Sequence, residues 1–350
     1  MVRIAINGFG RIGRVTLRVL AKRGWPLELV AINDPFLSPQ TAAHLVKYDT
    51  VYGRAPFPVS ATEKALHVDG REIRFFGDKD GYKDPAALPW KDLGIDVVIE
   101  ASGAFTDPAL AGGHLKAGAK RVLISAPPKG EESADVPQIL WRINEHHFDP
   151  QKHQIVSAAS CTTNSLGPVV KVLHEAFGIE HGFLTTIHAY TADQRLVDAP
   201  HRDLARARAA AANIVPTSTG AARSIPIIFP ELKGKMDGIA MRVPVPSGSV
   251  SDFVAKLKRP AGATMKEAVE NVNRAFEEAA KGPLGEVMAV TRDPIVSSDV
   301  LGEDHSAVVA LAYTMVLSAA LDVVKVLSFY DNEWGYCCRL VDVAQYIAGR

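Results

Sequence analysis

The sequence predicts an α/β protein of two domains, and three observations lead to this prediction. The first third of the 350 residues alternates short apolar runs with amphipathic helical patterns, which is typical of parallel strands joined by crossover helices. After residue 161 the apolar runs become longer and fewer helices separate them, which favours an antiparallel sheet. A chain of this length also exceeds the usual size of a single hydrophobic core.

The first domain is expected at residues 1–160, completed by a C-terminal helix within 331–350 that is most regular at 336–347. Its strands are predicted at 2–6, 27–33, 96–101, 121–125 and 155–159, and its helices at 11–23 and 108–117. A turn signal between two strand-like runs predicts a β-hairpin within 66–76. These elements predict a doubly wound parallel sheet that includes one antiparallel hairpin.

The second domain is expected at residues 161–330, with an α+β fold around a mostly antiparallel sheet. Its helices are predicted at 166–177 and 265–280, and its strands at 182–189, 238–245, 250–257, 308–317 and 323–330. No flexible linker separates the domains, so we expect them to share the functional site.

Charge and composition exclude several classes of function. Lys+Arg and Asp+Glu are both 39, so we expect neither nucleic acid nor an anionic membrane as the primary partner. The arginines within 201–208 are interpreted as a solvated face. No apolar run is long enough to span a bilayer, and the first residues lack the apolar core of a signal peptide. Three cysteines in an odd set favour a reducing, cytoplasmic compartment.

A dinucleotide-binding motif follows the first predicted strand. Gly8, Gly10 and Gly13 form a GxGxxG that opens a helix, and Asp34 ends the next strand. In the Rossmann-type fold such glycines allow a tight turn, close approach of a pyrophosphate and close helix packing. The carboxylate holds ribose hydroxyls and disfavours a 2′-phosphate. The sequence therefore predicts NAD as the cofactor in preference to NADP.

One cysteine lies where a strand gives way to a helix. Cys161 is surrounded by serine, threonine and asparagine, and a helix dipole at that position is expected to lower the pKa of its thiol. His188, at the end of a later strand-like run, is a candidate base for it. A lone cysteine is also often a small buried hydrophobe, so the residues alone leave both interpretations open.

Eight segments, in order along the whole chain, together resemble one family, the glyceraldehyde-3-phosphate dehydrogenases. They are residues 7–14 (NGFGRIGR), 47–49 (KYD), 125–127 (SAP), 159–164 (ASCTTN), 188–191 (HAYT), 218–222 (STGAA), 241–244 (MRVP) and 330–333 (YDNE). The resemblance implies that Cys161 attacks an aldehyde to give a thiohemiacetal, and that His188 takes the proton. Oxidation by NAD then leaves a thioester, which inorganic phosphate converts to an acyl phosphate.

The resemblance also implies binding residues, a homotetramer and no metal. The substrate phosphate would be held by Thr191, Asp193 and Arg242. The attacking phosphate would be held by Ser160, Thr162, Arg206, Thr219 and Gly220. Further cofactor contacts would come from Arg11, Ile12, Ser125, Asn332 and Tyr336.

Four other functions remain as alternatives. Erythrose-4-phosphate dehydrogenases share the cysteine and histidine signatures, although residues 218–222 look more like the triose enzyme. Semialdehyde dehydrogenases and acyl-phosphate reductases are more distant rivals with the same nucleophile. A non-catalytic NAD-binding regulator is disfavoured, because such a protein has no need for Cys161, His188 and Arg242 together.

Overall fold

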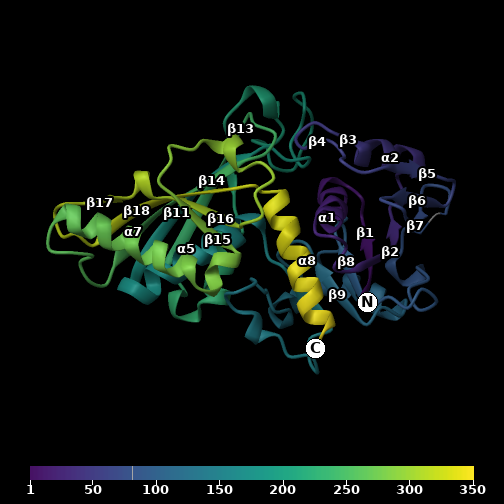
Figure 1. Cartoon of the computed structure of the whole chain (residues 1–350), viewed down its shortest axis with the longest axis horizontal. Helices are drawn as coiled ribbons and strands as arrows, with labels where there is room; N and C mark the ends of the chain where they lie inside the picture. The colour runs from purple at the N-terminus through teal and green to yellow at the C-terminus, as the bar shows by residue number, and fades with distance from the viewer. Residues whose placement is uncertain (81) are drawn as a thin grey trace. The chain divides into compact units, whose positions relative to one another are not determined.

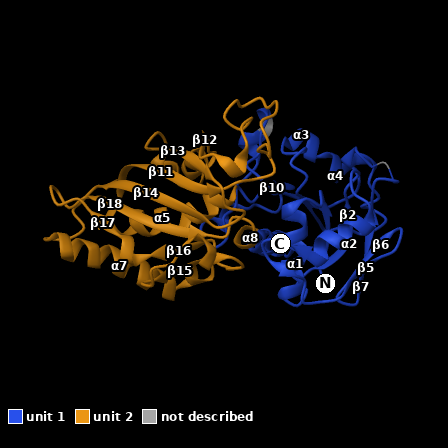
Figure 2. Cartoon of the chain, turned by 90° about the horizontal axis from the view of Figure 1, so that it is seen from above, with its two compact units in different colours: residues 1–159, 337–350 blue, residues 160–336 orange. Residues whose placement is uncertain are grey.

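The computed structural model describes residues 1–80 and 82–350 and divides into two compact units. Figure 2 distinguishes unit 1, Met1–Ala159 with Cys337–Arg350, from unit 2, Ser160–Tyr336. The sequence placed the domain boundaries at 160/161 and 330/331. Among the described residues, no helix combines the length and the apolar character that a transmembrane span requires.

Unit 1 is built on an eight-stranded sheet in the order β10-β9-β8-β1-β2-β7-β6-β5. From β10 to β7 every neighbouring pair is parallel. The strands are β1 (Arg3–Asn7), β2 (Glu28–Asn33), β5 (Val59–Ala61), β6 (Ala65–Val68), β7 (Arg71–Phe76), β8 (Val97–Glu100), β9 (Arg121–Ile124) and β10 (Ile155–Ser157). The predicted parallel sheet is confirmed, and β1, β2 and β8 lie at its centre (Figure 1).

The predicted hairpin forms between β6 and β7, which pair antiparallel. Its two turn residues, Asp69 and Gly70, have φ angles of 53° and 75°. Two consecutive positive φ values are typical of a type I′ turn, whose twist matches that of the flanking strands.

The helices of unit 1 are α1 (Arg11–Lys22), α2 (Pro39–Lys47), α3 (Pro108–Ala111), α4 (Gly113–Lys116) and the larger part of α8 (Trp334–Ala348). Short 3₁₀ turns occupy Pro85–Ala87, Glu131–Asp135 and Glu145–His147, and β3 (Tyr48–Asp49) pairs with β4 (Gly53–Arg54). The single helix predicted at 108–117 is wrong, because it is divided at Gly112. Two successive glycines weaken a helix, and a Cβ on Gly113 would lie 2.9 Å from Cβ of Pro85.

Unit 2 contains a second eight-stranded sheet in the order β12-β13-β11-β14-β18-β16-β15, with β17 paired to β18. The strands are β11 (Ile179–Ala189), β12 (Val215–Ser218), β13 (Met236–Val243), β14 (Ser249–Leu257), β15 (Met288–Thr291), β16 (Ala307–Ala310), β17 (Met315–Val316) and β18 (Val323–Tyr330). Within this second sheet, as the structure describes it, only the β11–β13 and β15–β16 pairs are parallel. The prediction of a mostly antiparallel sheet is therefore confirmed.

The helices of unit 2 are α5 (Cys161–Phe177), α6 (Ala221–Ile228) and α7 (Met265–Lys281). Short 3₁₀ turns lie at Ala210–Ala212, Pro230–Leu232, Pro283–Glu286, Ser297–Val300 and Leu311–Tyr313. The last of these turns interrupts the strand predicted at 308–317, which is wrong as one element.

The two faces of this second sheet differ in burial. Along β11, Leu184, Thr186 and His188 are buried, whereas Phe183 is 65% exposed. Helix α5 packs against β11, β14, β16 and β18 (Figure 1), so it covers the face to which the buried side chains point. The other face of the sheet presents apolar side chains to its surroundings.

Candidate active site

Cys161 is the first residue of α5. Oγ of Ser160, the N-cap, accepts a hydrogen bond of 3.1 Å from the amide of Thr163. Ala159 has a φ of 54°, which an L-residue other than glycine adopts rarely and at some cost. The sharp turn between β10 and α5 therefore sets the direction in which the half-buried thiol leaves the backbone.

The predicted base lies within reach of the predicted nucleophile. Nε2 of His188 lies 3.4 Å from Sγ of Cys161. Nδ1 of His188 lies 2.7 Å from the carbonyl oxygen of Ala189 and 2.6 Å from a terminal guanidinium nitrogen of Arg242. Arg242 stands directly opposite His188 in the parallel register of β11 and β13. The sheet therefore fixes the imidazole and the guanidinium side by side.

Burial controls the protonation of the pair. It raises the pKa of the Cys161 thiol, although the positive charge of Arg242 opposes the change. The predicted lowering of this pKa is therefore wrong in direction, because desolvation of the thiolate outweighs the stabilisation by the Arg242 charge and by hydrogen bonds at the start of α5. Burial, with the Arg242 charge, lowers the pKa of His188 to about 3. Near neutral pH a thiol thus faces an uncharged imidazole that can accept its proton.

A buried tyrosine, to which the sequence analysis assigned no role, joins the elements that carry this pair. The Tyr330 hydroxyl lies 2.9 Å from Oγ1 of Thr162 and 2.9 Å from Oγ1 of Thr186. Thr162 follows the nucleophile in α5, and Thr186 lies two residues before His188 in β11. The Tyr330 ring also meets the His188 ring edge to face, with centroids 6.0 Å apart. Tyr330 was part of a matched segment, but its contacts depend on strand pairing that the sequence does not reveal.

Two predicted anion-binding residues form an ion pair. A guanidinium nitrogen of Arg206 donates to the Asp193 carboxylate, and Nε of Arg206 donates to Oγ1 of Thr217 at 2.8 Å. The charges of Arg206 and Asp193 also act on Arg242, lowering and raising its pKa respectively, although burial is the largest influence on it. Asp193 is therefore placed to orient Arg206.

The remaining predicted anion ligands lie at turns and helix starts. Gly220 is the N-cap of α6, and Oγ1 of Thr219 accepts from the Ala221 amide at 3.2 Å. At the start of α5, Ser160 is itself the N-cap and accepts through its own side chain. The amide of Thr191 donates to Oε1 of Gln194 at 3.3 Å. Helix starts offer unpaired N–H groups and positive potential, which suit phosphate oxygens.

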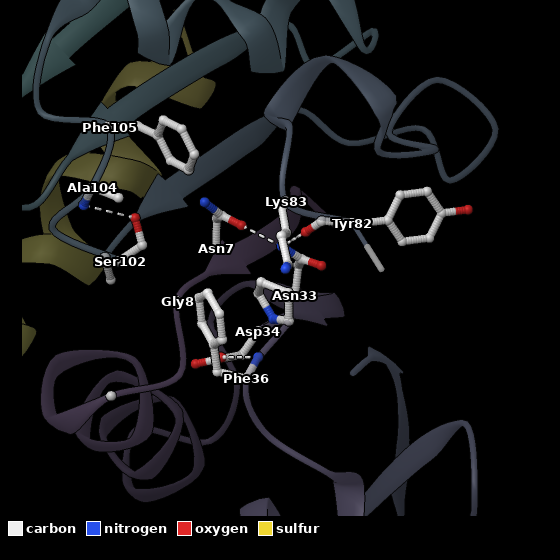
Figure 3. A pocket seen from close by; sticks show the side chains of 13 residues that line it. Asn7, Gly8, Asn33, Asp34, Phe36, Tyr82, Lys83, Ser102, Ala104 and Phe105 are labelled. Carbon is white, nitrogen blue, oxygen red and sulfur yellow. Dashed lines mark hydrogen bonds between the residues drawn. The ribbon is translucent and has the colours of Figure 1, made fainter. Parts of the chain in front are cut away.

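Unit 1 contains a cavity of about 330 Å³ at the carboxyl ends of β1, β2 and β8 (Figure 3). Gly8, Gly10 and Asp34 line it. A Cβ on Gly8 would lie 2.3 Å from the Ser102 backbone, and one on Gly13 would lie 2.3 Å from the Gly8 carbonyl. Nothing lies within 4 Å of a Cβ built on Gly10. Gly8 and Gly13 thus permit close backbone packing, and Gly10 leaves room for a ligand. This arrangement suits the binding of a dinucleotide.

The acidic residue predicted to hold the ribose also lines this cavity. The Asp34 carboxylate accepts from the amides of Phe9 at 2.9 Å and Phe36 at 3.1 Å. These bonds fix both oxygens, and each keeps further acceptor capacity for hydroxyl groups. Phe36, Tyr82 and Lys83 also line the cavity and were missed by the sequence, which offers no periodic signal for loop residues.

The other predicted cofactor residues lie outside the lining of that cavity. Arg11 pairs with Asp49 at 2.5 Å, and Ile12 is half-buried in the first turn of α1. The Ser125 amide donates to the Glu100 carbonyl at 2.9 Å, just after β9. Asn332 and Tyr336 belong to unit 2, where Oδ1 of Asn332 accepts from Oγ of Ser249 at 2.8 Å.

Comparison with known proteins identifies relatives over the whole chain. Residues 2–108 match the NAD binding domain of glyceraldehyde 3-phosphate dehydrogenase, and residues 160–332 match its C-terminal domain. The chain is 48% identical over 349 residues to glyceraldehyde-3-phosphate dehydrogenase 2 of Streptomyces avermitilis, covering 100% of this chain and 99% of that protein. It is 47% identical over 349 residues to the Geobacillus stearothermophilus enzyme, with 100% and 99% covered.

These matches confirm the resemblance that eight short segments indicated. They cover both units, and the model of the NAD binding domain includes all three motif glycines and Asp34. The chain belongs to the glyceraldehyde-3-phosphate dehydrogenase family.

Proposed function

We propose that the protein oxidises glyceraldehyde 3-phosphate to an acyl phosphate, with NAD as hydride acceptor and inorganic phosphate as acyl acceptor. The observation that carries the proposal is the contact of 3.4 Å between Sγ of Cys161 and Nε2 of His188, beside the Arg242 guanidinium. A nucleophile, a base and a cation suited to a phosphate group thus occur together in a member of this family.

The first step is attack of the Cys161 sulfur on the aldehyde carbon. The thiol proton passes to Nε2 of His188 as the carbon–sulfur bond forms. This uncharged imidazole is within reach, and with its Nδ1–H donating to the Ala189 carbonyl it keeps a lone pair on Nε2. The protonated imidazole then gives that proton to the new oxyanion, which completes the thiohemiacetal. Amides at the start of α5 would stabilise the developing negative charge.

The second step is oxidation of the thiohemiacetal. NAD, when bound, supplies the acceptor for the hydride that leaves the former aldehyde carbon. His188 takes the hydroxyl proton at the same time, so that a carbonyl re-forms and the product on Cys161 is a thioester. A phosphate oxygen then attacks the thioester carbon, and sulfur leaves as a thiolate that recovers its proton from His188.

Two anion subsites are part of the proposal. Arg242, joined by Thr191, would hold the phosphate of the substrate. Arg206, oriented by Asp193, would hold the attacking phosphate together with Thr219 and the starts of α5 and α6. A forked guanidinium and helix-start amides are groups that phosphate oxygens require.

We also propose a cytoplasmic homotetramer. The uncovered face of the unit 2 sheet carries Phe183, 65% exposed, opposite Val254 on the neighbouring strand. The same unit has an apolar cavity of about 370 Å³ lined by Ile187, Val250 and Phe329, among others. Exposed apolar side chains gathered on one face of a sheet are typical of a subunit contact, and a second copy of the chain is the occupant we propose.

The test is formation of NADH by the purified protein in four reactions. Glyceraldehyde 3-phosphate and erythrose 4-phosphate are each supplied with and without inorganic phosphate. Faster turnover of the triose substrate that depends on phosphate supports the proposal. Faster turnover of erythrose 4-phosphate, or indifference to phosphate, would overturn it. Repeating the triose reaction with NADP measures cofactor preference.

A further inference from the structure

Unit 1 contains a buried carboxylate that takes no part in the chemistry proposed above. Glu100, the last residue of β8, is 1% exposed, and its side chain accepts four hydrogen bonds. Oε1 accepts from the amide and from the hydroxyl of Ser102. Oε2 accepts from Nδ2 of Asn7 at 2.5 Å and lies 3.0 Å from Nε2 of His114. Four converging donors suit a carboxylate, which only accepts.

The indole of Trp90 fixes the tautomer of the histidine. Its Nε1–H donates to Nδ1 of His114 at 3.0 Å. An indole nitrogen can only donate, so Nδ1 must present a lone pair, and the single ring proton lies on Nε2, facing Glu100. Trp90, His114 and Glu100 are all buried. The buried hydrogen bonds from Trp90 to His114 and from His114 to Glu100 therefore fix the orientation of the carboxylate.

The same carboxylate also binds two residues that line the cavity proposed for NAD. Ser102 and Asn7 both line that cavity. A Cβ on Gly8 would clash with the Ser102 backbone. The position of Ser102 therefore determines how much space is left beside Gly8, the first glycine of the motif. Oγ of Ser102 in turn accepts from the Ala104 amide at 3.1 Å, which shapes the loop after β8 (Figure 3).

Asn7 extends the network to the next strand. Its Oδ1 accepts from Nδ2 of Asn33 at 2.7 Å, and Asn33 also lines the cavity (Figure 3). Because Nδ2 of Asn7 is directed to Glu100, its amide cannot flip without losing both partners. One carboxylate thus fixes polar groups at the ends of three parallel strands, β1, β2 and β8, where a ligand of such a sheet binds.

We propose that Glu100 is a positioning residue for the cofactor. It holds Ser102, Asn7 and, through Asn7, Asn33 in the arrangement that receives NAD, and it does so without touching the reacting atoms. This inference rests on the proposed use of the cavity for NAD. It concerns NAD affinity and not the chemistry at Cys161.

The test compares NAD binding by Glu100→Gln, a nearly isosteric change, with that of the wild type by titration calorimetry on the full chain. The amide NH₂ must face either the Ser102 donors or the Asn7 and His114 donors, so two donors lose their acceptor. We expect the Kd for NAD to rise about 10-fold or more and kcat to stay within about 2-fold. The control is Glu72→Gln, an exposed carboxylate 4.0 Å from His67 in the β6–β7 hairpin, which should leave Kd unchanged.

A double variant separates positioning from general loss of structure. Asn7→Asp combined with Glu100→Gln reverses the bond between the two side chains, and the carboxylate introduced on β1 still accepts from Asn33. The N–H of His114 still lacks its acceptor in this variant, so we expect the double variant to recover part of the lost NAD affinity. An unchanged Kd in Glu100→Gln, or a double variant no better than the single one, would overturn the proposal.

If Glu100→Gln does not fold, Ser102→Ala serves instead, because Ser102 is exposed and loses only the hydroxyl. It should raise Kd by about 3-fold with an unchanged Tm, and no change in Kd would overturn the proposal. Turnover of the wild type, measured in parallel, distinguishes failure of the proposed function from failure of the proposed role of Glu100. A wild type that binds NAD but does not oxidise glyceraldehyde 3-phosphate removes the proposed function and leaves the binding comparison intact.

Discussion

Nε2 of His188 lies 3.4 Å from Sγ of Cys161, and both residues belong to unit 2. The strand that carries the base and the helix that carries the nucleophile pack against each other. The distance between the two groups therefore depends on the packing of α5 on the sheet, and not on a flexible loop.

The nucleophile can be tested by Cys161→Ser. A hydroxyl is a far weaker nucleophile than a thiol at this position, so we expect turnover to be lost. NAD binding should stay within about 2-fold of the wild type, because the cavity proposed for NAD lies in unit 1. Cys338→Ser, in buried α8, is the matched control and should retain activity. Turnover by Cys161→Ser would remove the assignment.

The base can be tested by His188→Asn. We expect kcat to fall by about 10²–10⁴-fold, the usual effect of removing a general base. Alkylation of Cys161 by iodoacetamide should slow as well, because proton removal from the thiol is no longer assisted. Equal alkylation rates in variant and wild type would contradict a role for His188 in activating the thiol.

The same variant should change stability in acid. Folding lowers the pKa of His188 from 6.5 to about 3, so the unfolded chain binds this proton more readily. The stability from the uncharged imidazole is fully present above pH 6.5 and is lost as the pH falls toward 3. His188→Asn should therefore reduce the slope of unfolding free energy against pH in that window, by up to about 1.4 kcal/mol per pH unit.

The hydroxyl of Tyr330 bridges Thr162 and Thr186, so Tyr330→Phe leaves two buried hydroxyls without this partner. We expect a loss of about 1–3 kcal/mol in unfolding free energy and a fall in kcat of about 10-fold, since a small misplacement of nucleophile and base is costly. Tyr313→Phe, in the same unit and half-buried, is the control for both measurements. A Tyr330→Phe variant with wild-type kcat would limit Tyr330 to a structural role.

Two glycine substitutions should separate folding from cofactor binding. Gly10→Ala places a methyl group in open space, so Tm should stay close to the wild type while the Kd for NAD rises about 10-fold or more. Gly8→Ala combines a φ of 90° with a clash at 2.3 Å and should unfold unit 1. Unchanged NAD affinity in Gly10→Ala would place the pyrophosphate elsewhere.

The sequence predicted most of the fold because its signals are local. Alternating apolar runs mark the strands, and Asp69-Gly70 marks the hairpin. The break of the predicted helix near Gly112 was missed in part because the close approach of Gly113 to Pro85 is not visible in the sequence. The same reason explains why Glu100 was missed: its three partner residues come from β1, α4 and the loop after β8. The 3₁₀ turn that divides the predicted strand at Leu311 was also missed.

The sequence predicted which residues form the candidate site, but it did not predict their contacts or their burial. Cys161, His188 and Arg242 stood out as members of matched segments, and the sheet register brings the last two together. The direction of the Cys161 pKa was wrong because a helix start is visible in sequence, whereas the burial of the thiol is not.

The most direct test of the central claim is the reaction of the protein with glyceraldehyde 3-phosphate and NAD in the absence of inorganic phosphate. Rapid mixing followed by mass spectrometry should show one burst of NADH per active site and a matching acyl group on the peptide that contains Cys161. Addition of phosphate should then release that group as the acyl phosphate. A burst with no adduct on Cys161, or an adduct that phosphate does not release, would contradict the account.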